Sequence, residues 1–303
     1  MIDEVVIQNF RCLRDVRVPL TPLTVLVGAN GSGKTSVLDA VLRRHRENDY
    51  WRKDAKLTIR VELRNGGNLV ASSVKSSGNW KASGQQPVAQ VLQLDLQQLR
   101  SANQLAEVRT IDASGFGLTN LFATLTRPKQ DALAKEFCRL VPMYADVAAK
   151  PLAGGHHRLV FEDRWQPGVW YEPQEVSDGS MLLFAFLALQ HEDPAPDLIG
   201  IEEPERGLHP FLLNELLVML RRLTNGGLGR KQIQVLLATH SADLLEFVKP
   251  EEVRFLSRSA ENGDVVIEQA PTTAPEWPKA VREYQGSLGK MWLSGGLGGV
   301  PGN

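Results

Sequence analysis

This sequence of 303 residues lacks the cysteine content of a disulfide-bonded protein and the long apolar runs of a membrane protein. Its only cysteines, Cys12 and Cys138, are too few for a disulfide framework or a zinc cluster, which favours a reducing compartment. No stretch approaches the roughly 20 consecutive apolar residues that a transmembrane helix needs. The start, Met1 followed by IDEVVIQNF, has neither the basic residues nor the long apolar run of a signal peptide. We therefore expect a soluble, cytoplasmic protein without a membrane partner.

A strong charge of either sign is also missing, because the formal net charge is −1. This value argues against a uniformly basic nucleic-acid-binding body and leaves room only for a local basic face. The contents of hydrophobic residues, 43%, and charged residues, 23%, are those of an ordinary globular protein. The length suffices for one large domain or two lobes.

Residues 28–36, GANGSGKTS, fit the phosphate-binding pattern G-x-x-x-x-G-K-[ST]. In such a loop, backbone N–H groups surround a polyphosphate, Lys34 reaches the β- and γ-phosphates, and the Thr35 hydroxyl binds Mg²⁺. The apolar run LTVLV precedes the loop and SVLDAVLRR follows it with helical spacing, as this chemistry requires. The sequence therefore predicts a nucleoside triphosphate site. Its nucleotide-binding residues are Gly28, Ala29, Asn30, Gly31, Ser32, Gly33, Lys34, Thr35 and Ser36.

Strand and helix patterns alternate along much of the chain, which predicts an α/β protein with a parallel sheet. EVVIQNF and LRDVRVPL predict a hairpin, and KLTIRVELRNGGNLVASSVK together with VAQVLQLDL predicts an antiparallel sheet. A helical stretch at 118–144, a strand pair around QPG and the helix SMLLFAFLALQ follow. LIGIEEP and QIQVLLATH predict strands on either side of the amphipathic helix FLLNELLVMLRRL. The glycine-rich end is expected to be mobile or to become ordered on a partner.

The apolar residues 198–201 lead into two carboxylates, Glu202 and Glu203. A magnesium-nucleotide site needs one carboxylate toward the metal ion and another to polarise the attacking water. We assign Glu202 to the Mg²⁺ ligands and Glu203 to the general base. Adjacent strand residues point to opposite faces, so both reach one site only if the chain turns there. A solvated acidic turn is the alternative.

His240 follows the strand pattern QIQVLLAT, at the edge of a sheet where α/β proteins bind ligands. There it can hydrogen-bond the γ-phosphate or the lytic water. The alternative is a histidine that only caps and packs. Ser241 or Asp243 is expected to cap the helix that follows.

Three residues, Ser177, Asp178 and Gly179, stand directly before an apolar helix pattern. Ser177 suits an N-cap, and the helix N-terminus is an anion site in its own right. A plain helix cap explains these residues equally well. The order of the motifs along the chain favours a place for these residues in the nucleotide site. The phosphate-binding loop comes first, followed by the SDG segment, the strand that ends in EEP and the strand that ends in TH.

That order resembles the ABC-type ATPases, in which the Ser-Gly signature of one subunit completes the nucleotide site of the other. NFRCLRDVRVPLTPLTVLVGANGSGKTSVLDAV, EEPERGLHP and ATHSADLL are most similar to the RecF/SMC-like branch with its compact OLD-type heads. The resemblance covers residues 1–45 and 170–250 well and the middle only in outline. It implies a P-loop NTPase with ABC-ATPase head architecture, comprising a mixed core sheet, an antiparallel β subdomain and a helical signature lobe. Residues 1–303 would form a single head, with lobe I at about 1–100 plus 197–303 and lobe II at about 101–196.

The resemblance also implies site roles. Residues 28–36 match Walker A, Glu202 and Glu203 match Walker B and its catalytic glutamate, and His240 matches the switch histidine. Lys34, Glu203 and His240 would be the catalytic residues, with Thr35 and Glu202 on the metal. Arg11 matches a basic position that approaches the nucleotide in relatives. The signature and the D-loop match Ser177, Asp178 and Gly179, and Gly207, Leu208 and His209.

Three features depart from the family pattern. The signature reads SDGSM, which puts an acidic side chain near a phosphate. Glu202 stands where aspartate is usual, and Gln93, Gln97 and Gln98 compete for the Q-loop position. No heptad run indicates a coiled coil, and no acidic cluster after His240 indicates a nuclease domain, so a bare head is expected.

The leading functional interpretation is an ATP-hydrolysing switch that uses ATP and Mg²⁺ and forms a homodimer around two ATP molecules. Related heads act in DNA repair or defence against phages, which implies a separate nuclease or toxin-like effector. An ATP-gated clamp with little hydrolysis is an alternative, and so, with less support, is the nucleotide-binding subunit of a transporter. A P-loop kinase is disfavoured because no arginine-rich lid is evident.

DNA binding is the weakest prediction. It depends on a basic stretch interleaved with aromatics, which could hold phosphates and stack a base. A solvated helix face is an equally good interpretation. The stretch comprises Arg43, Arg44, Arg46, Tyr50, Trp51, Arg52 and Lys53.

Overall fold

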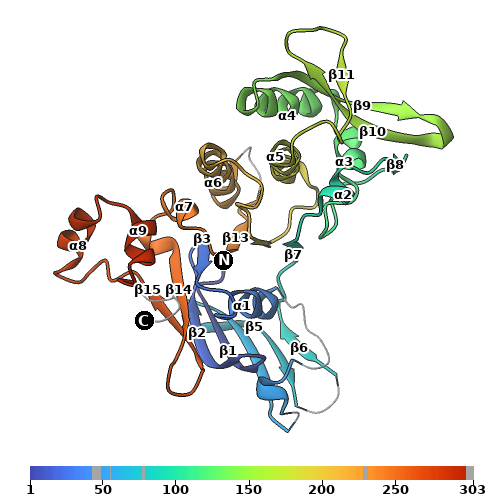
Figure 1. Ribbon diagram of the computed structural model, residues 1–303. Coiled ribbons are helices and arrows are strands. Elements are labelled where there is room, and N and C mark those ends of the chain that lie inside the picture. Colours follow the sequence, from blue (N-terminus) through green and yellow to red (C-terminus); the bar gives the residue numbers. More distant parts are fainter. Residues whose placement is uncertain (43–48, 55, 77–78, 228–230, 298–303) are drawn as a thin grey trace. The chain divides into compact units, whose positions relative to one another are not determined.

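Figure 1 shows the computed structural model, which describes residues 1–303 except 43–48, 55, 77–78, 228–230 and 298–303. The chain divides into two compact units. Unit 1 comprises residues 1–91, 196–204 and 220–303, and unit 2 comprises residues 92–195 and 205–219. Residues 205–219, which the sequence placed in lobe I, therefore lie in unit 2.

A six-stranded mixed sheet runs through unit 1 in the order β15-β14-β3-β13-β12-β7. β3 pairs in parallel with β13 and β14, and β12 pairs in parallel with β13. β3 and β13 are buried at every position, as expected of parallel strands covered on both faces. The bounds are β3 Leu23–Val27, β7 Ala89–Leu92, β12 Leu198–Glu202, β13 Gln234–Thr239, β14 Val253–Arg258 and β15 Val265–Gln269.

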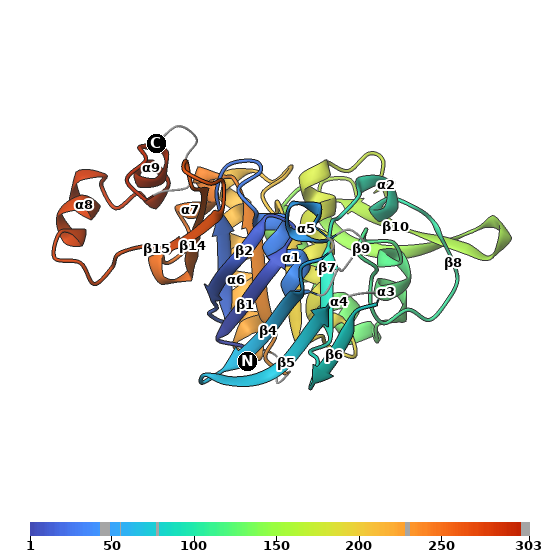
Figure 2. The ribbon, with the colours of Figure 1, turned by 90° about the horizontal axis from the view of Figure 1, so that it is seen from below.

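A second sheet of unit 1 is antiparallel, in the order β2-β1-β4-β5-β6 (Figure 2). The predicted hairpins at its β1–β2 and β4–β5 pairs are confirmed. The prediction that VAQVLQLDL belongs to this sheet is wrong, because β7 is an edge strand of the six-stranded sheet. The bounds are β1 Glu4–Phe10, β2 Leu13–Pro19, β4 Ile59–Asn65, β5 Asn68–Lys75 and β6 Lys81–Gly84.

Helix α1, Lys34–Val41, joins the two sheets in one core. Its Val37, Leu38 and Val41 belong to a buried cluster that includes residues of both sheets. Gly200 of β12 permits this approach, since a Cβ there would lie 2.0 Å from Leu42 Cδ1. Three shorter helices of unit 1 follow β13: α7 Ala242–Leu245, α8 Trp277–Glu283 and α9 Leu288–Leu293. The beginning of the glycine-rich end is thus ordered, and its last residues, 298–303, lie outside the described residues.

Unit 2 is built around α5, whose residues 180–188 are all buried. Phe184 of α5 contacts the rings of Phe122, Phe137 and Phe161 at centroid distances of 5.3 to 5.8 Å. The strand pair around QPG is confirmed as β10 and β11, whereas β9, the longest strand, was not predicted from YADVAAKPL. The bounds in order are α2 Leu96–Leu99, β8 Asn103–Gln104, α3 Leu118–Thr124, α4 Arg127–Leu140, β9 Tyr144–Leu152, β10 His156–Asp163, β11 Trp170–Tyr171 and α5 Asp178–Ala188. Helix α6, Pro210–Thr224, begins in unit 2 and ends in unit 1.

Among the described residues, no helix combines the length and the apolar character that crossing a membrane requires.

Candidate functional site

The loop of residues 28–33 connects β3 to α1 in unit 1. A Cβ on Gly28 would lie 2.4 Å from the carbonyl oxygen of Leu256, so only glycine fits there. Gly31 and Gly33 have φ values of 79° and 112°, in the region that favours glycine. Lys34 Nζ donates to the carbonyl oxygens of Gly28 at 2.7 Å and Ala29 at 3.0 Å, which places its ammonium over the loop.

Two observations fit this loop to a polyphosphate. The N-terminus of α1 has no side-chain cap and no acidic residue in its first turn, so its backbone N–H groups and positive dipole end suit an anion. The Ser32 hydroxyl is buried and has no hydrogen-bond partner among the described residues. The N–H groups of the helix and the Ser32 hydroxyl are hydrogen-bond donors that need an acceptor. A phosphate oxygen would supply it.

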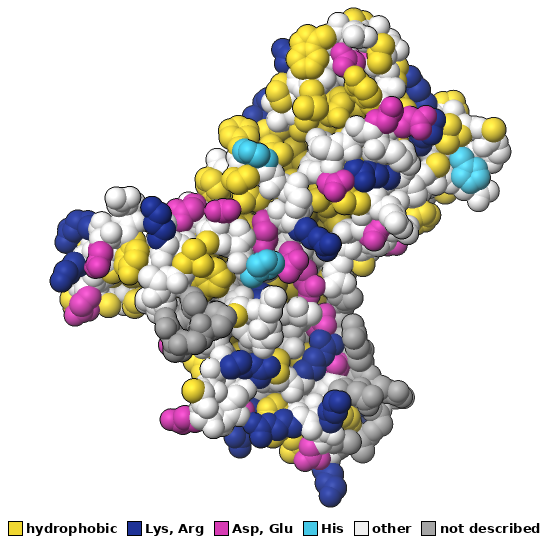
Figure 3. All heavy atoms as spheres, viewed as in Figure 1, with side chains coloured by type: hydrophobic (Ala, Val, Ile, Leu, Met, Phe, Trp, Pro, Cys, Tyr) yellow, Lys and Arg dark blue, Asp and Glu magenta, His cyan; other side chains and the backbone are white. Residues whose placement is uncertain are grey.

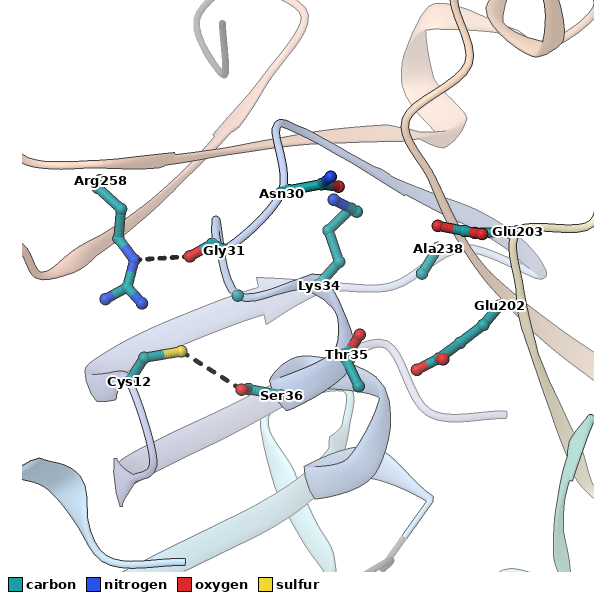
Figure 4. Close-up of a pocket in the computed structure, with 11 residues that line it drawn as sticks. Cys12, Asn30, Gly31, Lys34, Thr35, Ser36, Glu202, Glu203, Ala238 and Arg258 are labelled. Atoms are coloured by element: carbon teal, nitrogen blue, oxygen red, sulfur yellow. Dashed lines mark hydrogen bonds between the residues drawn. The ribbon is translucent and has the colours of Figure 1, made fainter. Parts of the chain in front are cut away.

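A pocket of about 260 Å³ lies over this loop, within unit 1 (Figure 4). Of the predicted loop residues 28–36, Gly28, Ala29 and Ser32 do not line it. The lining residues are Cys12, Asn30, Gly31, Gly33, Lys34, Thr35, Ser36, Glu202, Glu203, Ala238 and Arg258.

Glu202 and Glu203 both line this pocket. Glu202 is the last residue of β12, whereas Glu203 has a φ of 46°, in the left-handed region that non-glycine residues seldom adopt. This turn, fixed by a 2.8 Å hydrogen bond from Glu203 N to Ala238 O, brings two adjacent side chains to one site. Strained backbone of this kind is concentrated at functional sites.

His240 directly follows β13, and its Nδ1 lies 3.2 Å from Glu203 Oε1. Both side chains are about half exposed. His240 is therefore beside the pocket and in contact with one of its lining residues, although it does not line the pocket itself. Ser241 caps α7 by accepting a hydrogen bond from Leu244 N at 3.2 Å. Of the two predicted capping residues, Ser241 is therefore the one that caps the helix.

Arg11 does not line the pocket. Its Nη1 lies 2.5 Å from Asp39 Oδ2 and its Nε 2.6 Å from Asp49 Oδ1. Burial acts to lower the pKa of Arg11, but the hydrogen bonds to Asp49 and Asp39 outweigh it and hold the pKa above its ordinary value. The positive charge of Arg11 is thus compensated by two aspartates, and its predicted contact with the nucleotide stays a prediction.

Three residues that line the pocket, Cys12, Ala238 and Arg258, were missed by sequence reasoning, and two of them bring polar side chains. Arg258, at the end of β14, donates from Nε to Gly31 O at 2.9 Å, and Cys12 Sγ lies 3.3 Å from Ser36 Oγ. Neither stands in a motif, and only the pairing of β14 with β3 brings Arg258 to the loop.

The SDG segment lies in unit 2, at the N-terminus of α5. Ser177 is the predicted N-cap and accepts a hydrogen bond from Ser180 N at 3.3 Å. Asp178 Oδ1 is 2.7 Å from Arg100 Nη2, which also donates to Val176 O at 2.7 Å. Arg100 therefore compensates the acidic charge that distinguishes this signature.

The D-loop triplet contacts the SDG segment within unit 2. A Cβ on Gly179 would lie 2.5 Å from Gly207 O, so glycine is required at position 179 by close backbone approach. Gly207 has a φ of 75°, which also favours glycine. Leu208 is buried, and exposed His209 accepts a hydrogen bond from Phe211 N at 3.2 Å.

The predicted DNA-binding stretch is only partly described, because Arg43, Arg44 and Arg46 lie outside the described residues. The guanidinium groups of Arg52 and Arg14 lie 4.4 and 5.3 Å from the Trp51 ring. Figure 3 shows Lys and Arg side chains over the β1, β2 and β5 region of unit 1. Trp51 is thus already engaged by two cations, and DNA binding stays a prediction.

The residues that suit a metal ion are few. Among the described residues, no group of three or more His, Cys, Asp or Glu side chains could hold a metal by itself. Thr35 and Glu202 line one pocket and offer a hydroxyl and a carboxylate. This sparse oxygen set fits Mg²⁺, which takes its other ligands from phosphate oxygens and water.

Two family models and one curated relative match parts of this chain. Residues 1–85 match the family described as AAA ATPase domain, and residues 111–246 match the family described as AAA domain, putative AbiEii toxin, Type IV TA system. The OLD nuclease of Thermus scotoductus is 51% identical over 41 residues, a stretch that spans 14% of this chain and only 8% of that relative.

Solved structures similar to this chain include SMC heads. An SMC head bound to the C-winged helix domain of ScpA has a TM-score of 0.63 at 16% identity, covering 90% of this chain and 99% of that one. The Pyrococcus furiosus SMC head with an extended coiled coil, bound to the C-terminal domain of ScpA, has a TM-score of 0.60 at 12% identity, covering 94% and 99%. The Thermotoga maritima SMC head has a TM-score of 0.51 at 14% identity, covering 88% and 98%. At these identities the likeness establishes the fold.

Proposed function

We propose that this chain, an ABC/SMC-like P-loop ATPase, is a switch that binds Mg-ATP, associates head to head around it and separates after hydrolysis. The observation that carries the proposal is the left-handed turn at Glu203. It brings the Glu203 carboxylate into the pocket that Lys34, Thr35 and Glu202 also line. A solvated acidic turn would not need this backbone strain.

Each residue at the pocket has its own role in the proposed hydrolysis of ATP. Thr35 and Glu202 would hold Mg²⁺, which supplies positive charge at the phosphate oxygens. Lys34 leaves its two loop carbonyls to stabilise charge on the β- and γ-phosphates. Glu203 accepts the proton of a water molecule whose oxygen bonds to the γ-phosphorus as the bond to ADP breaks. His240 holds the Glu203 carboxylate in place.

The signature acts in trans in this proposal. Ser177 and the N-terminus of α5 offer a hydroxyl and backbone N–H groups to the γ-phosphate bound by a second copy. The Arg100–Asp178 ion pair supports this role because it offsets the one acidic charge at that helix N-terminus. Gly179 and Gly207 keep the signature and the D-loop in backbone contact.

An ATP-gated clamp with little turnover is the second candidate. The observation in its favour is that Glu203 Oε1 already has a partner in His240, which would restrain it as a base. The longer Glu202 side chain in place of aspartate would also loosen the metal site. Turnover at saturating ATP distinguishes the clamp from the switch.

A partner is part of the proposal, because a switch whose output is motion must act on something. One matched family carries the description putative AbiEii toxin, and one relative is called a nuclease. We therefore propose a separate nuclease- or toxin-like effector in the cytoplasm, in DNA repair or anti-phage defence.

The test measures solution mass by light scattering, with and without Mg-ATP, together with phosphate release. We expect Glu203→Gln to abolish turnover and to accumulate as a dimer in Mg-ATP. Glu268→Gln, an exposed carboxylate on β15 outside the pocket, is the matched control and should behave as wild type. If Glu203→Gln still releases phosphate and its solution mass is the same with and without Mg-ATP, the assignment of Glu203 as the base and the switch mechanism are both refuted.

A further inference from the structure

The nucleotide pocket carries a positive charge that no recognised motif supplies. Arg258, the last residue of β14, lines the pocket with its side chain exposed. Its Nε donates to Gly31 O at 2.9 Å and its Nη1 to Gly263 O at 2.8 Å. Both acceptors are neutral carbonyls, and no carboxylate among the described residues forms an ion pair with Arg258.

Arg11 provides the contrast. Its Nη1 contacts Asp39 and its Nε contacts Asp49, so its charge is compensated inside unit 1. Arg258 has no such carboxylate partner among the described residues, and no described group accepts from its Nη2. An arginine with an uncompensated charge and spare donors beside a phosphate-binding loop suits an anionic oxygen, because such hydrogen bonds are the strong ones.

The position of Arg258 selects which part of the nucleotide it meets. Figure 4 shows Glu202 and Glu203 on one side of Lys34 and Thr35, and Arg258 and Cys12 on the other. The carboxylate side suits Mg²⁺ and the γ-phosphate. Since Lys34 reaches the β- and γ-phosphates and Thr35 the metal ion, the α-phosphate and the nucleoside fit the opposite side, where Ser36 of α1 contacts Cys12.

We propose that Arg258 is a nucleotide-binding residue that contacts the α-phosphate end of a nucleoside di- or triphosphate while holding Gly31 of the loop. This inference rests on the proposed nucleotide site and adds a specificity to it. Arg258 contributes equally to ATP and ADP, because both carry the same α-phosphate. The groups on the carboxylate side, by contrast, distinguish ATP from ADP.

The test measures dissociation constants of Mg-ATP and Mg-ADP by calorimetry on the full chain at several salt concentrations. We expect Arg258→Gln to weaken both nucleotides by the same factor, about tenfold, and to flatten the dependence of affinity on salt. Arg258→Lys keeps the charge and should lose less, about threefold, with the salt dependence retained. Arg17→Gln, an exposed β2 arginine outside the pocket, is the control and should bind as wild type.

Three outcomes separate the possibilities. If the wild type binds neither nucleotide, the proposed function itself fails. If the wild type binds but Arg258→Gln stays within twofold, or loses ATP alone, the assignment of Arg258 is overturned. If affinity falls while the salt dependence stays that of wild type, Arg258 only ties the loop, and the phosphate contact is likewise overturned.

Discussion

The imidazole of His240 and the carboxylate of Glu203 meet at the ends of two neighbouring parallel strands, with Nδ1 3.2 Å from Oε1. This side-chain contact therefore links the residue after β13 to the residue after β12. Because Glu203 also has a strained backbone, His240 is the side chain placed to fix its carboxylate.

We expect His240→Ala to lower the rate of phosphate release at saturating Mg-ATP at least tenfold, because the base loses its orienting contact. ATP affinity should stay within about twofold, since Lys34 and the loop are untouched. Stopped-flow phosphate release and calorimetry separate the two quantities. A variant with weaker ATP binding and an unchanged maximal rate would make His240 a binding residue instead.

Gly179→Ala is expected to abolish ATP-dependent dimerisation while leaving ATP binding by unit 1 intact. The new methyl group would meet the backbone oxygen of Gly207 at 2.5 Å, and backbone cannot move aside cheaply. The steric cost, about 1–3 kcal/mol, falls on the contact between the signature and the D-loop. Light scattering in Mg-ATP measures the loss, and normal dimers from this variant would contradict the role given to that contact.

Arg100→Gln should weaken dimerisation in Mg-ATP because it leaves the Asp178 carboxylate uncompensated at the N-terminus of α5. The informative comparison is the double variant Arg100→Gln with Asp178→Asn, in which no charge is left to offset. We expect this variant to recover most of the dimer population. Without that recovery, Arg100 would act through its hydrogen bonds to the carbonyls of Pro173 and Val176 instead.

Cys138 is expected to resist alkylation at neutral pH. Burial, with a smaller contribution from Asp146, raises the pKa of its thiol to about 11, and only the thiolate is nucleophilic. In a Cys12→Ser variant, the iodoacetamide rate should rise about tenfold per pH unit from pH 8 and level off near pH 11. A rate that levels off below pH 9 would contradict this.

Cys12 should be protected by nucleotide, because its thiol lines the pocket beside Ser36. In a Cys138→Ser variant, saturating Mg-ATP is expected to slow alkylation of Cys12 several-fold. Mass spectrometry of the labelled peptide gives the rate. Equal alkylation rates with and without Mg-ATP would contradict the position of Cys12 in the nucleotide pocket.

Local patterns predicted much of this protein. The loop of residues 28–36, its flanking strand and helix, and the strands that end at Glu202 and Thr239 all follow from short-range spacing. The hairpin of β4 and β5 follows from alternation on either side of its glycine turn. The residues that specify each of these elements lie within about ten positions of it.

The features that the sequence missed depend on contacts between distant residues. Arg100 lies 78 positions before Asp178, and Arg258 lies 227 positions after Gly31, so no local pattern joins either pair. The alternation in VAQVLQLDL is compatible with either sheet, and the order of strands decides which one β7 joins. The left-handed φ of Glu203 is imposed by its hydrogen bond to Ala238, because glutamate has no intrinsic preference for it.

The place of β3 in its sheet has a consequence for synthesis on the ribosome. β3 lies between β13 and β14, both made from residues after 233. A nascent chain that ends earlier holds a mostly apolar strand, β3, with neither of its partners, and such unpaired edges promote association with other chains. The phosphate-binding loop is thus translated long before the two strands that flank β3, so the growing chain needs protection until residues 234–258 have been made.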